Sequence, residues 1–402
     1  MISRRFLLQS AAAAAAFAAP RVRAARAENA PGVTDTEIKI GQTMPYSGPV
    51  SAYGVIGRAE AAYFKMINEQ GGINGRKINL ISVDDAYSPP KTVEQVRRLI
   101  EQEQVAFLFQ TLGTPCNAAV RQYLNDNKVP QLFVSTGATM FSDPQHFPWT
   151  MGYNPTYRTE AHIYAKHILA TKPDARIAVL YQNDDSGRDY LTSLKDGLGP
   201  DKEGMIVKEA SYEVTDPTVD SQVVTLQGSG ADVFFIAATA KGGAQAARKS
   251  YDLGWNATRY ISLNSSSIAV LKTAGLDKSK GLITAGPFVE VADPRWKDLP
   301  DMKEWQAFTS KYMSALEYSN SVAAYGYGAA ATMVQVLKQC GNDLSRENVM
   351  RQAANLKDFH APLLVPGVTI NTSPTNYSPI RQLQLSKFDG ESWQPLGDVM
   401  SD

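Results

Sequence analysis

The feature that most constrains the fold is a regular alternation of strand-like and helix-like segments, joined by short turns. In the first third of the chain, apolar runs typical of buried strands occur near 37–44, 77–83, 105–110 and 130–135. Amphipathic, helix-like stretches separate them, near 54–70, 90–103 and 115–127. Strands that alternate with helices in this way indicate an α/β fold, in which a parallel sheet carries helices on both faces.

The alternation restarts after "PWTMGYNPTYR", residues 148–158. The second series predicts helices near 157–170, 187–198, 218–228 and 241–253, with strands near 176–182, 206–212, 232–238 and 259–263. A chain of 402 residues is too long for one hydrophobic core, so the two series predict two lobes, each with a doubly wound sheet.

The last third breaks this pattern. Two helical segments, near 301–314 and 321–340, follow each other without a clear strand between them. The stretch "RQLQLSKFDGESWQPLG" then alternates apolar and polar residues around Asp389-Gly390, which predicts a β-hairpin.

The N-terminus has the composition of an export signal. It reads "MISRRFLLQSAAAAAAFAAPRVRAARAENA", with a basic start, an Ala-rich apolar middle and small residues around Ala27, where we expect cleavage. The sequence leaves open whether the general or the twin-arginine route exports it. We therefore expect a periplasmic protein, with residues 1–27 removed.

Charge and hydropathy exclude two classes of partner. The 40 basic and 40 acidic side chains balance, whereas nucleic-acid binding requires a basic surface. No apolar run reaches the roughly 20 residues of a membrane span. We expect a monomer that binds a small molecule, with neither nucleic-acid binding nor membrane insertion.

Polar turns follow most of the predicted strands. They include Ser47 to Ser51 in "IKIGQTMPYSGPVSAYG", Thr111 to Thr114, Ser135 to Thr139, Asp184 to Ser186, Thr239, and Asn264 to Ser267. In doubly wound sheets such turns meet at the carboxyl ends of the strands, where ligands bind. Their hydroxyls and free helix N–H groups suit a carboxylate or an amide. Each turn alone fits a helix cap equally well, but six together favour a shared cleft.

Signals for catalysis or cofactor binding are weak. There is no P-loop, no G-x-S-x-G and no H-E-x-x-H pattern. Cys116 and Cys340 cannot form a zinc site alone, and their spacing permits a disulfide without requiring one. We predict no metal, no cofactor and no enzyme activity. A secreted hydrolase with Ser135 or Ser186 as nucleophile is the alternative.

From about residue 36 to 398, the chain resembles the Leu/Ile/Val-binding type of periplasmic solute-binding protein, the receptor subunit of ATP-binding-cassette (ABC) importers. The resemblance rests on "IKIGQTMPYSGPVSAYG", "INEQGGINGRKINLISVDDAYSP", "VPQLFVSTGAT", "IAVLYQNDDSGRD" and "GWNATRYIS". It implies a type I periplasmic binding protein: two doubly wound parallel-sheet lobes joined by three hinge crossings, with an ABC permease in the inner membrane as partner.

The resemblance also implies boundaries for the lobes. The crossings are expected near 153–156, 284–288 and 361–366. Lobe 1 would comprise residues 36–154 and 287–361, and lobe 2 would comprise residues 156–284 and 366–398.

The predicted ligand contacts are Tyr53, Leu112, Gly113, Thr114, Gly137, Ala138, Thr139, Tyr157, Ser186, Ala238, Thr239 and Asn264. In the family, the positions of Thr139 and of the Gly137 and Ala138 backbone hold the ligand carboxylate and its neighbouring amine. The position of Tyr53 is an aromatic wall.

The site also departs from the family pattern. Gly113 replaces a hydroxyl residue, Asn264 replaces the acid that binds the ligand ammonium, and Ser186 and Ala238 replace aromatic residues. These changes predict a roomier pocket for a carboxylate-bearing solute without an α-amino group, with an aromatic acid as the first candidate. Amide or urea-like solutes, branched-chain amino acids, and a sensory module of the same fold are the alternatives.

Overall fold

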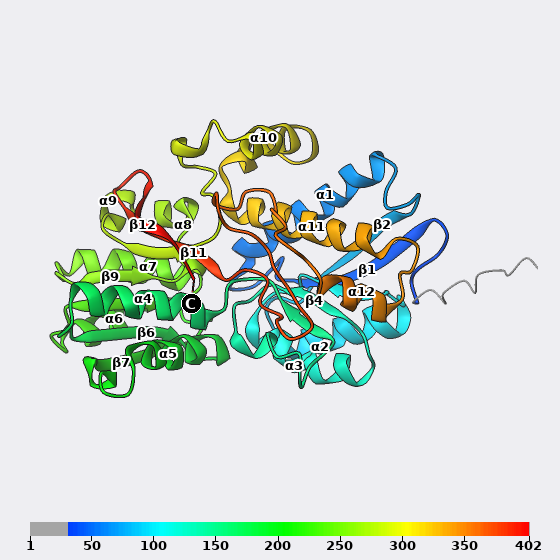
Figure 1. The fold of residues 1–402 in the computed structure, drawn as a ribbon. Coiled ribbons are helices and arrows are strands. Elements are labelled where there is room, and N and C mark those ends of the chain that lie inside the picture. Colours follow the sequence, from blue (N-terminus) through cyan, green and yellow to red (C-terminus); the bar gives the residue numbers. More distant parts are fainter. Residues whose placement is uncertain (1–30, 402) are drawn as a thin grey trace, which may run out of the picture.

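The computed structural model describes residues 31–401 and forms two α/β lobes, each built on its own sheet (Figure 1). The predicted signal segment, residues 1–27, lies outside the described residues. Both sheets have parallel strands connected through helices, which confirms the predicted fold class.

The first lobe has a five-stranded parallel sheet in the order β2-β1-β3-β4-β5. Its strands are β1 (Glu37–Met44), β2 (Lys77–Asp84), β3 (Leu108–Phe109), β4 (Gln131–Val134) and β5 (Thr150–Gly152). The helices between them are η1 (Ser51–Gly54), α1 (Val55–Glu69), α2 (Pro89–Arg97), η2 (Arg98–Gln102), α3 (Thr114–Asp126) and η3 (Thr139–Phe141).

Strand β3 is shorter than the predicted 105–110. Gln110 has a φ of 51°, in the left-handed region, so the extended conformation ends just after Phe109. The apolar run from Val105 to Phe109 is nevertheless fully buried, because both faces of this central strand are covered by helices.

The second lobe has a seven-stranded sheet in the order β12-β11-β10-β9-β8-β6-β7. Its strands are β6 (Ile177–Gln182), β7 (Ile206–Tyr212), β8 (Val233–Ala237), β9 (Thr258–Ile261), β10 (Ile283–Gly286), β11 (Gln382–Phe388) and β12 (Trp393–Ser401). Its helices are α4 (Tyr157–Thr171), α5 (Asp185–Leu198), η4 (Glu203–Met205), α6 (Asp220–Gln227), α7 (Ala240–Asp252), η5 (Leu263–Ser265), α8 (Ile268–Ala274) and α9 (Leu276–Ser279).

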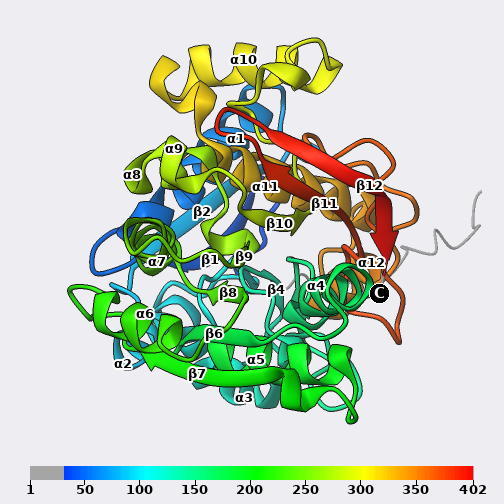
Figure 2. The same cartoon turned by 90° about the vertical axis from the view of Figure 1, so that its left-hand side faces the viewer.

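Helices cover both faces of the second sheet, with α4 and α5 on one side and α6, α7 and α8 on the other, as Figure 2 shows. Val179 and Phe235 pack with α4 and α5, while Leu180 and Ile236 pack with α6, α7 and α8. The predicted hairpin is confirmed: β11 and β12 pair antiparallel at the sheet edge. The Asp389 carboxylate closes the turn by accepting hydrogen bonds from two following backbone N–H groups.

The C-terminal helices return to the first lobe (Figure 1). They are η6 (Pro294–Trp296), α10 (Pro300–Tyr312), η7 (Ala315–Ser319), α11 (Ser321–Cys340) and α12 (Arg346–Ala353). Helix α11 packs closely on α1 at Gly326, where a Cβ would lie 2.7 Å from the Ile56 carbonyl oxygen. The core of the first lobe therefore combines residues from the first and the last third of the chain.

Two of the connections between the lobes run side by side. Val289 N–H donates to the Leu363 carbonyl at 2.8 Å, and Val365 N–H donates to the Pro287 carbonyl at 2.7 Å. The third connection follows β5 and leads into α4. These two hydrogen bonds lie close to the predicted crossings, and they hold the two connecting segments together where the lobes meet.

Three further features concern the whole described chain. Cys116 and Cys340 are both buried and free. Within residues 31–401, no helix has the length and apolar character needed to cross a membrane. The same part of the chain contains no group of three or more His, Cys, Asp or Glu side chains placed to hold a metal ion.

Candidate ligand-binding cleft

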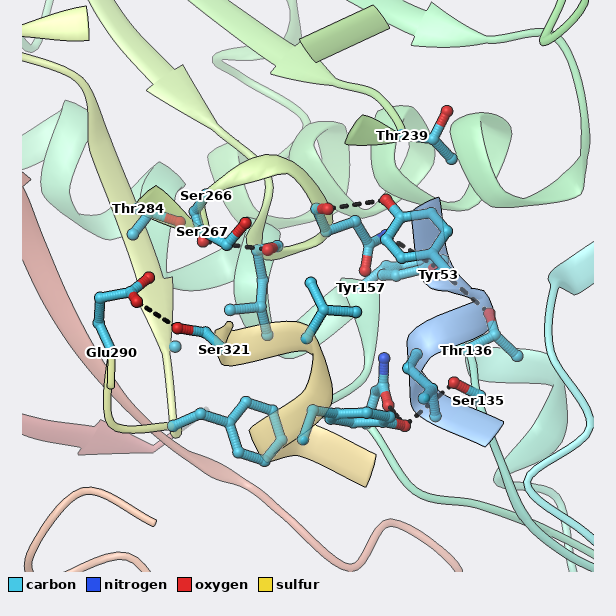
Figure 3. A pocket seen from close by; sticks show the side chains of 18 of the residues that line it. Tyr53, Ser135, Thr136, Tyr157, Thr239, Ser266, Ser267, Thr284, Glu290 and Ser321 are labelled. Atoms are coloured by element: carbon cyan, nitrogen blue, oxygen red, sulfur yellow. Dashed lines mark hydrogen bonds between the residues drawn. The ribbon is translucent and has the colours of Figure 1, made fainter. Parts of the chain in front are cut away.

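A cavity of about 190 Å³ lies between the lobes, where turns from both sheets face each other (Figure 3). Nine of the twelve predicted ligand contacts line it: Tyr53, Leu112, Gly113, Thr114, Tyr157, Ser186, Ala238, Thr239 and Asn264. The cavity extends well beyond these residues. In Figure 3, Tyr53, Tyr157 and Thr136 lie at one end and Glu290 and Ser321 at the other.

We call the first of these the tyrosine end, defined by Tyr53, Thr114, Thr136, Tyr157 and Asn264. A chain of neutral hydrogen bonds runs through it and links both lobes. Thr114 Oγ1 lies 2.6 Å from Thr136 Oγ1, which lies 3.1 Å from Tyr157 Oη. Asn264 Nδ2 donates to Tyr157 Oη at 3.3 Å. The turns after β3, β4 and β9 thus meet, as the parallel topology requires.

Tyr53 holds the two lobes together. It lies in η1 of the first lobe, and its hydroxyl donates to the Asn264 carbonyl at 2.8 Å. The same oxygen accepts from the Ala240 N–H at the start of α7, at 2.9 Å. Both partners belong to the second lobe, so the structure has the closed arrangement of the lobes.

Two helix N-termini at this end favour an anion. Helix α3 begins at Thr114, without a bond from an N-cap side chain and without an acidic residue in its first turn. Helix α7 after Thr239 also lacks both, although its first N–H, at Ala240, already donates to the Tyr53 hydroxyl. Such ends carry partial positive charge. Gly113, with a φ of 99°, makes this approach possible, because a Cβ there would overlap the Tyr87 ring.

The acidic side chains nearest the tyrosine end are already occupied. Asp184 caps α5 and accepts hydrogen bonds from Ser186 N, Ser186 Oγ and Gly187 N. Its second oxygen accepts from Gln182 Nε2 at 2.5 Å. Asp184 is not among the residues that line the cavity, so it offers no free partner for a ligand ammonium.

Glu160 lies behind the cavity wall. Its carboxylate accepts from the Tyr164 and Tyr190 hydroxyls, each at 2.7 Å, and from Leu263 N at 2.8 Å. Burial raises the pKa of Glu160 to about 7. Tyr190 in turn stacks on Tyr157, with ring centroids 4.1 Å apart. Glu160 therefore supports the wall and does not reach the ligand space.

The remaining three predicted contacts, Gly137, Ala138 and Thr139, do not line the cavity. Thr139 donates its N–H and its hydroxyl to the Asp189 carboxylate, at 2.6 and 3.2 Å. The turn that follows β4 is folded against α5, so these donors are already used. Thr136, three residues before Thr139 in the same turn, lines the cavity instead.

Further aromatic walls come from positions that are not among the predicted contacts. Ser186 and Ala238 are small, as predicted, but Tyr87, Tyr190 and Tyr325 also line the cavity. Tyr325 lies within the long helix α11, where no turn signal marks it. The predicted loss of aromatic walls therefore applies at Ser186 and Ala238 but not to the cleft as a whole.

The sequence pattern does not predict the other end of the cavity. We call it the glutamate end, defined by Glu290, Arg295, Trp296 and Ser321, all of which line the cavity. The Ser321 hydroxyl donates to Glu290, as Figure 3 shows. These residues come from loops and helix starts in the last third, where the strand–helix pattern no longer indicates which turns meet.

Comparison with known proteins agrees with this architecture. A family model described as periplasmic binding protein matches residues 37–391. The chain is 25% identical over 321 residues to Leu/Ile/Val-binding protein homolog 1 of Brucella suis, covering 77% of this chain and 81% of that protein. It is 26% identical over 322 residues to the protein of the same name from Brucella abortus, with the same coverage.

Solved structures share the fold. A branched chain amino acid ABC transporter protein from Thermus thermophilus with bound valine has a TM-score of 0.83 at 16% identity, covering 92% of this chain and 98% of that one. A fatty acid ABC transporter substrate-binding protein from Thermomonospora curvata has a TM-score of 0.77 at 22% identity, covering 94% and 95%. The two-lobed fold, the cleft and the family match lead to one conclusion: the chain belongs to the periplasmic binding protein family.

Proposed function

We propose that this protein is the solute-binding subunit of an ABC importer and captures a small carboxylate-bearing solute without an α-amino group. The observation that carries this is the chemistry of the tyrosine end. It combines hydroxyls and the uncapped N-terminus of α3 with no carboxylate among the described residues that line it. An α-ammonium buried there without a charged partner would cost several kcal/mol.

An aromatic acid is the first candidate within this class. The rings of Tyr53, Tyr87, Tyr157 and Tyr190 all line the cavity and offer flat surfaces to a flat solute. Aromatic pairs contribute about 0.5–1.5 kcal/mol beyond the burial of their area. The carboxylate would lie near Thr114 and the start of α3, and the ring between the tyrosines.

The names of similar proteins support a second candidate. The Brucella relatives are named Leu/Ile/Val-binding, and the Thermus structure holds valine. A branched-chain amino acid would require an acid for its ammonium, and the acidic side chain that lines the cavity is Glu290, at the opposite end. The Thermomonospora protein is named for fatty acids, which are acids without an amine, and this name supports the first candidate class.

Capture would proceed by closure of the lobes around the solute. A ligand shifts an equilibrium between open and closed forms only by its greater affinity for one of them. Thr114 of the first lobe and Asn264 of the second both line the cavity, so a solute between them gains contacts only when the lobes close. The importer would then recognise the closed form.

We further propose that the mature protein is a periplasmic monomer that delivers its solute to a membrane permease. The family match and the export-signal composition of residues 1–27 support this. Mass spectrometry of the periplasmic fraction should find a chain that begins near Glu28. Co-purification with a permease would support import, whereas a sensor kinase would support the sensory alternative.

The ligand class is tested by a thermal-shift screen of amino acids, aromatic acids, amides and short-chain acids, followed by calorimetry. A ligand present at 100 times its dissociation constant adds about 2.7 kcal/mol of stability. We expect a benzoate-type acid to bind at least 100-fold more tightly than leucine, a gap of about 2.7 kcal/mol. Sub-micromolar binding of leucine would overturn the proposed ligand class. Turnover of ester substrates by the pure protein would revive the hydrolase alternative.

A further inference from the structure

One buried carboxyl group beside the cavity is not used by the proposed capture of an acid. Glu160 lies on α4, behind the part of the cavity wall that Tyr157 and Tyr190 form. It accepts hydrogen bonds from the Tyr164 and Tyr190 hydroxyls, each at 2.7 Å, and from the Leu263 N–H at 2.8 Å. None of these three donors carries a positive charge, so they solvate an ionised Glu160 without neutralising it.

Two short paths connect Glu160 to the tyrosine end. On the first, Tyr190 bonds to Glu160 and its ring stacks on Tyr157, with ring centroids 4.1 Å apart. On the second, Leu263 bonds to Glu160 and precedes Asn264, whose side chain donates to the Tyr157 hydroxyl at 3.3 Å. Tyr157 and Tyr190 are both buried, so water screens a charge on Glu160 only weakly from a charge at the tyrosine end.

The hydrogen bonds of Tyr164 allow Glu160 to be either ionised or neutral. The Tyr164 hydroxyl lies 2.7 Å from Glu160 Oε1 and 3.0 Å from the Ile261 carbonyl oxygen, so one hydrogen has two acceptors. When Glu160 is ionised, Tyr164 donates to the carboxylate. When Oε1 takes a proton from solvent, the new O–H donates to Tyr164 and the Tyr164 hydroxyl donates to Ile261. Tyr190 keeps Oε2 as its acceptor in both states.

The titratable side chains around Glu160 are mainly tyrosines. Tyr164 shares its helix, Tyr190 lies on α5, and Tyr260 on β9 packs on the Tyr164 ring with centroids 5.4 Å apart. Burial raises the pKa of all three tyrosines, so they are neutral near pH 7. His167 bonds to the Tyr260 hydroxyl at 2.6 Å, and burial lowers its pKa. Glu160, whose pKa burial raises to about 7, is therefore the group of this set that changes charge near neutral pH.

We propose that Glu160 is a proton-binding site coupled to the cleft, so that capture of an acid at the tyrosine end is accompanied by uptake of a proton from solvent. The negative charge of the solute disfavours the ionised form of Glu160. By reciprocity, a protonated Glu160 raises the affinity for the anion by the same factor. The coupling rests on the proposed function, because it requires a solute with a negative charge.

The proton site belongs to the second lobe alone. Its donors come from α4, α5 and η5, which are all elements of that lobe. Opening of the lobes therefore breaks none of the three hydrogen bonds to Glu160. The proton affinity of Glu160 consequently responds to the charge of the solute, and this separates the proposed coupling from closure itself.

Glu290 is the rival site for the proton. It lines the cavity, and burial raises its pKa. Its donors are the Ser321 hydroxyl and the backbone N–H groups of Ile268 and Ala292. Backbone N–H groups cannot accept, so a proton on Glu290 has fewer acceptors than one on Glu160. Figure 3 also shows Glu290 across the cavity from the tyrosine end.

The test is calorimetry of the mature protein with a benzoate-type acid, which stays ionised between pH 6 and pH 8.5. A coupling of about 5-fold, at the low end for linked sites, tightens binding about 4-fold from pH 8.5 to pH 6 when the free group titrates near pH 7. The same coupling predicts an uptake of about 0.4 proton per solute at pH 7.5. Titrations in phosphate and in Tris, which differ in ionisation enthalpy, measure that uptake.

Variants then assign the proton to one carboxyl group. Glu160→Gln resembles the neutral form, and we expect its affinity to change less than 1.5-fold between pH 6 and pH 8.5, with no proton uptake. Glu290→Gln is the matched control, and we expect it to keep both the pH dependence and the uptake. Far-UV circular dichroism would verify that both variants are folded. In the wild-type protein, the assigned ¹³C signal of the Glu160 carboxyl group should titrate at a higher pH with the acid bound than without it.

The possible outcomes separate the two proposals. An acid that binds with the same affinity at both pH values and without proton uptake would overturn the coupling alone. Loss of the pH dependence in Glu290→Gln but not in Glu160→Gln would overturn the assignment to Glu160, as would a ¹³C titration that the acid does not shift. If no acid binds, the proposed ligand class fails and the coupling fails with it.

Discussion

Removal of the Tyr53 hydroxyl is the most direct test of how the lobes are held closed. Tyr53→Phe removes one oxygen and keeps the ring that lines the cavity. In the wild-type structure, this oxygen donates to the Asn264 carbonyl at 2.8 Å and accepts from the Ala240 N–H at 2.9 Å. Both bonds join the first lobe to the second and exist only in the closed form. The substitution therefore destabilises the closed form and leaves the open form unchanged.

The expected magnitude follows from these two bonds. Each hydrogen bond contributes a net of about 0.5–1.5 kcal/mol, so the closed form loses about 1–3 kcal/mol relative to the open form. A coupling of that size corresponds to about a 5- to 150-fold loss of ligand affinity. Because water replaces both bonds in an open cleft, we expect the free energy of global unfolding to change by less than about 0.5 kcal/mol.

Calorimetry with the best ligand of the screen measures the affinity, and small-angle X-ray scattering with and without that ligand measures closure. Tyr251→Phe is the control, because Tyr251 lies on α7 and is 49% exposed, away from the cleft. If Tyr53→Phe binds as tightly as wild type and closes to the same extent, the hydroxyl does not stabilise the closed form and the argument fails.

Three further predictions concern the cleft and its support. Asn264→Glu should narrow the gap between leucine and a benzoate-type acid, because it restores a charge for the ammonium; calorimetry on both proteins measures the gap, and an unchanged gap would remove Asn264 from the site. Gly113→Ala should weaken binding at least 10-fold, since the new Cβ would overlap the Tyr87 ring at a backbone with a φ of 99°; undiminished affinity would contradict the close approach of α3. Burial raises the pKa of Glu160 to about 7, above its ordinary value near 4.5. The folded state therefore binds more protons between pH 4.5 and 7, and stability should fall by up to about 3 kcal/mol as pH rises through this window. Denaturant unfolding of wild type and Glu160→Gln at pH 5 and pH 8 isolates that contribution. If the free energy of unfolding changes equally between the two pH values in both proteins, Glu160 does not contribute and the prediction is wrong.

The local pattern of the chain determined most of the architecture. Alternating apolar strands and amphipathic helices specify parallel sheets, because parallel neighbours need a long crossover connection, which is usually a helix. The polar turns then necessarily lie at one edge of each sheet, and this is why nine of the predicted contacts meet in the cavity. The Asp389-Gly390 turn similarly specifies its hairpin through purely local geometry.

The orientation of individual side chains within a turn was not determined locally. Thr136 and Thr139 are three residues apart in the same turn, yet Thr136 lines the cavity while Thr139 is bonded to Asp189. The difference arises because α5, from the other lobe, packs against this turn and supplies the Asp189 carboxylate. No sequence pattern near residue 139 contains that information.

The tertiary structure alone decided the length of the cavity and the chemistry of its far end. Tyr325, Glu290 and Trp296 lie in segments where the strand–helix pattern has ended, and they reach the cleft because α11 returns to pack on α1. Contacts between segments more than 200 residues apart depend on the shape of the whole core, as at Gly326 against the Ile56 carbonyl. The sequence by itself therefore determined that a cleft exists between two lobes, and long-range packing decided which side chains it offers to a solute.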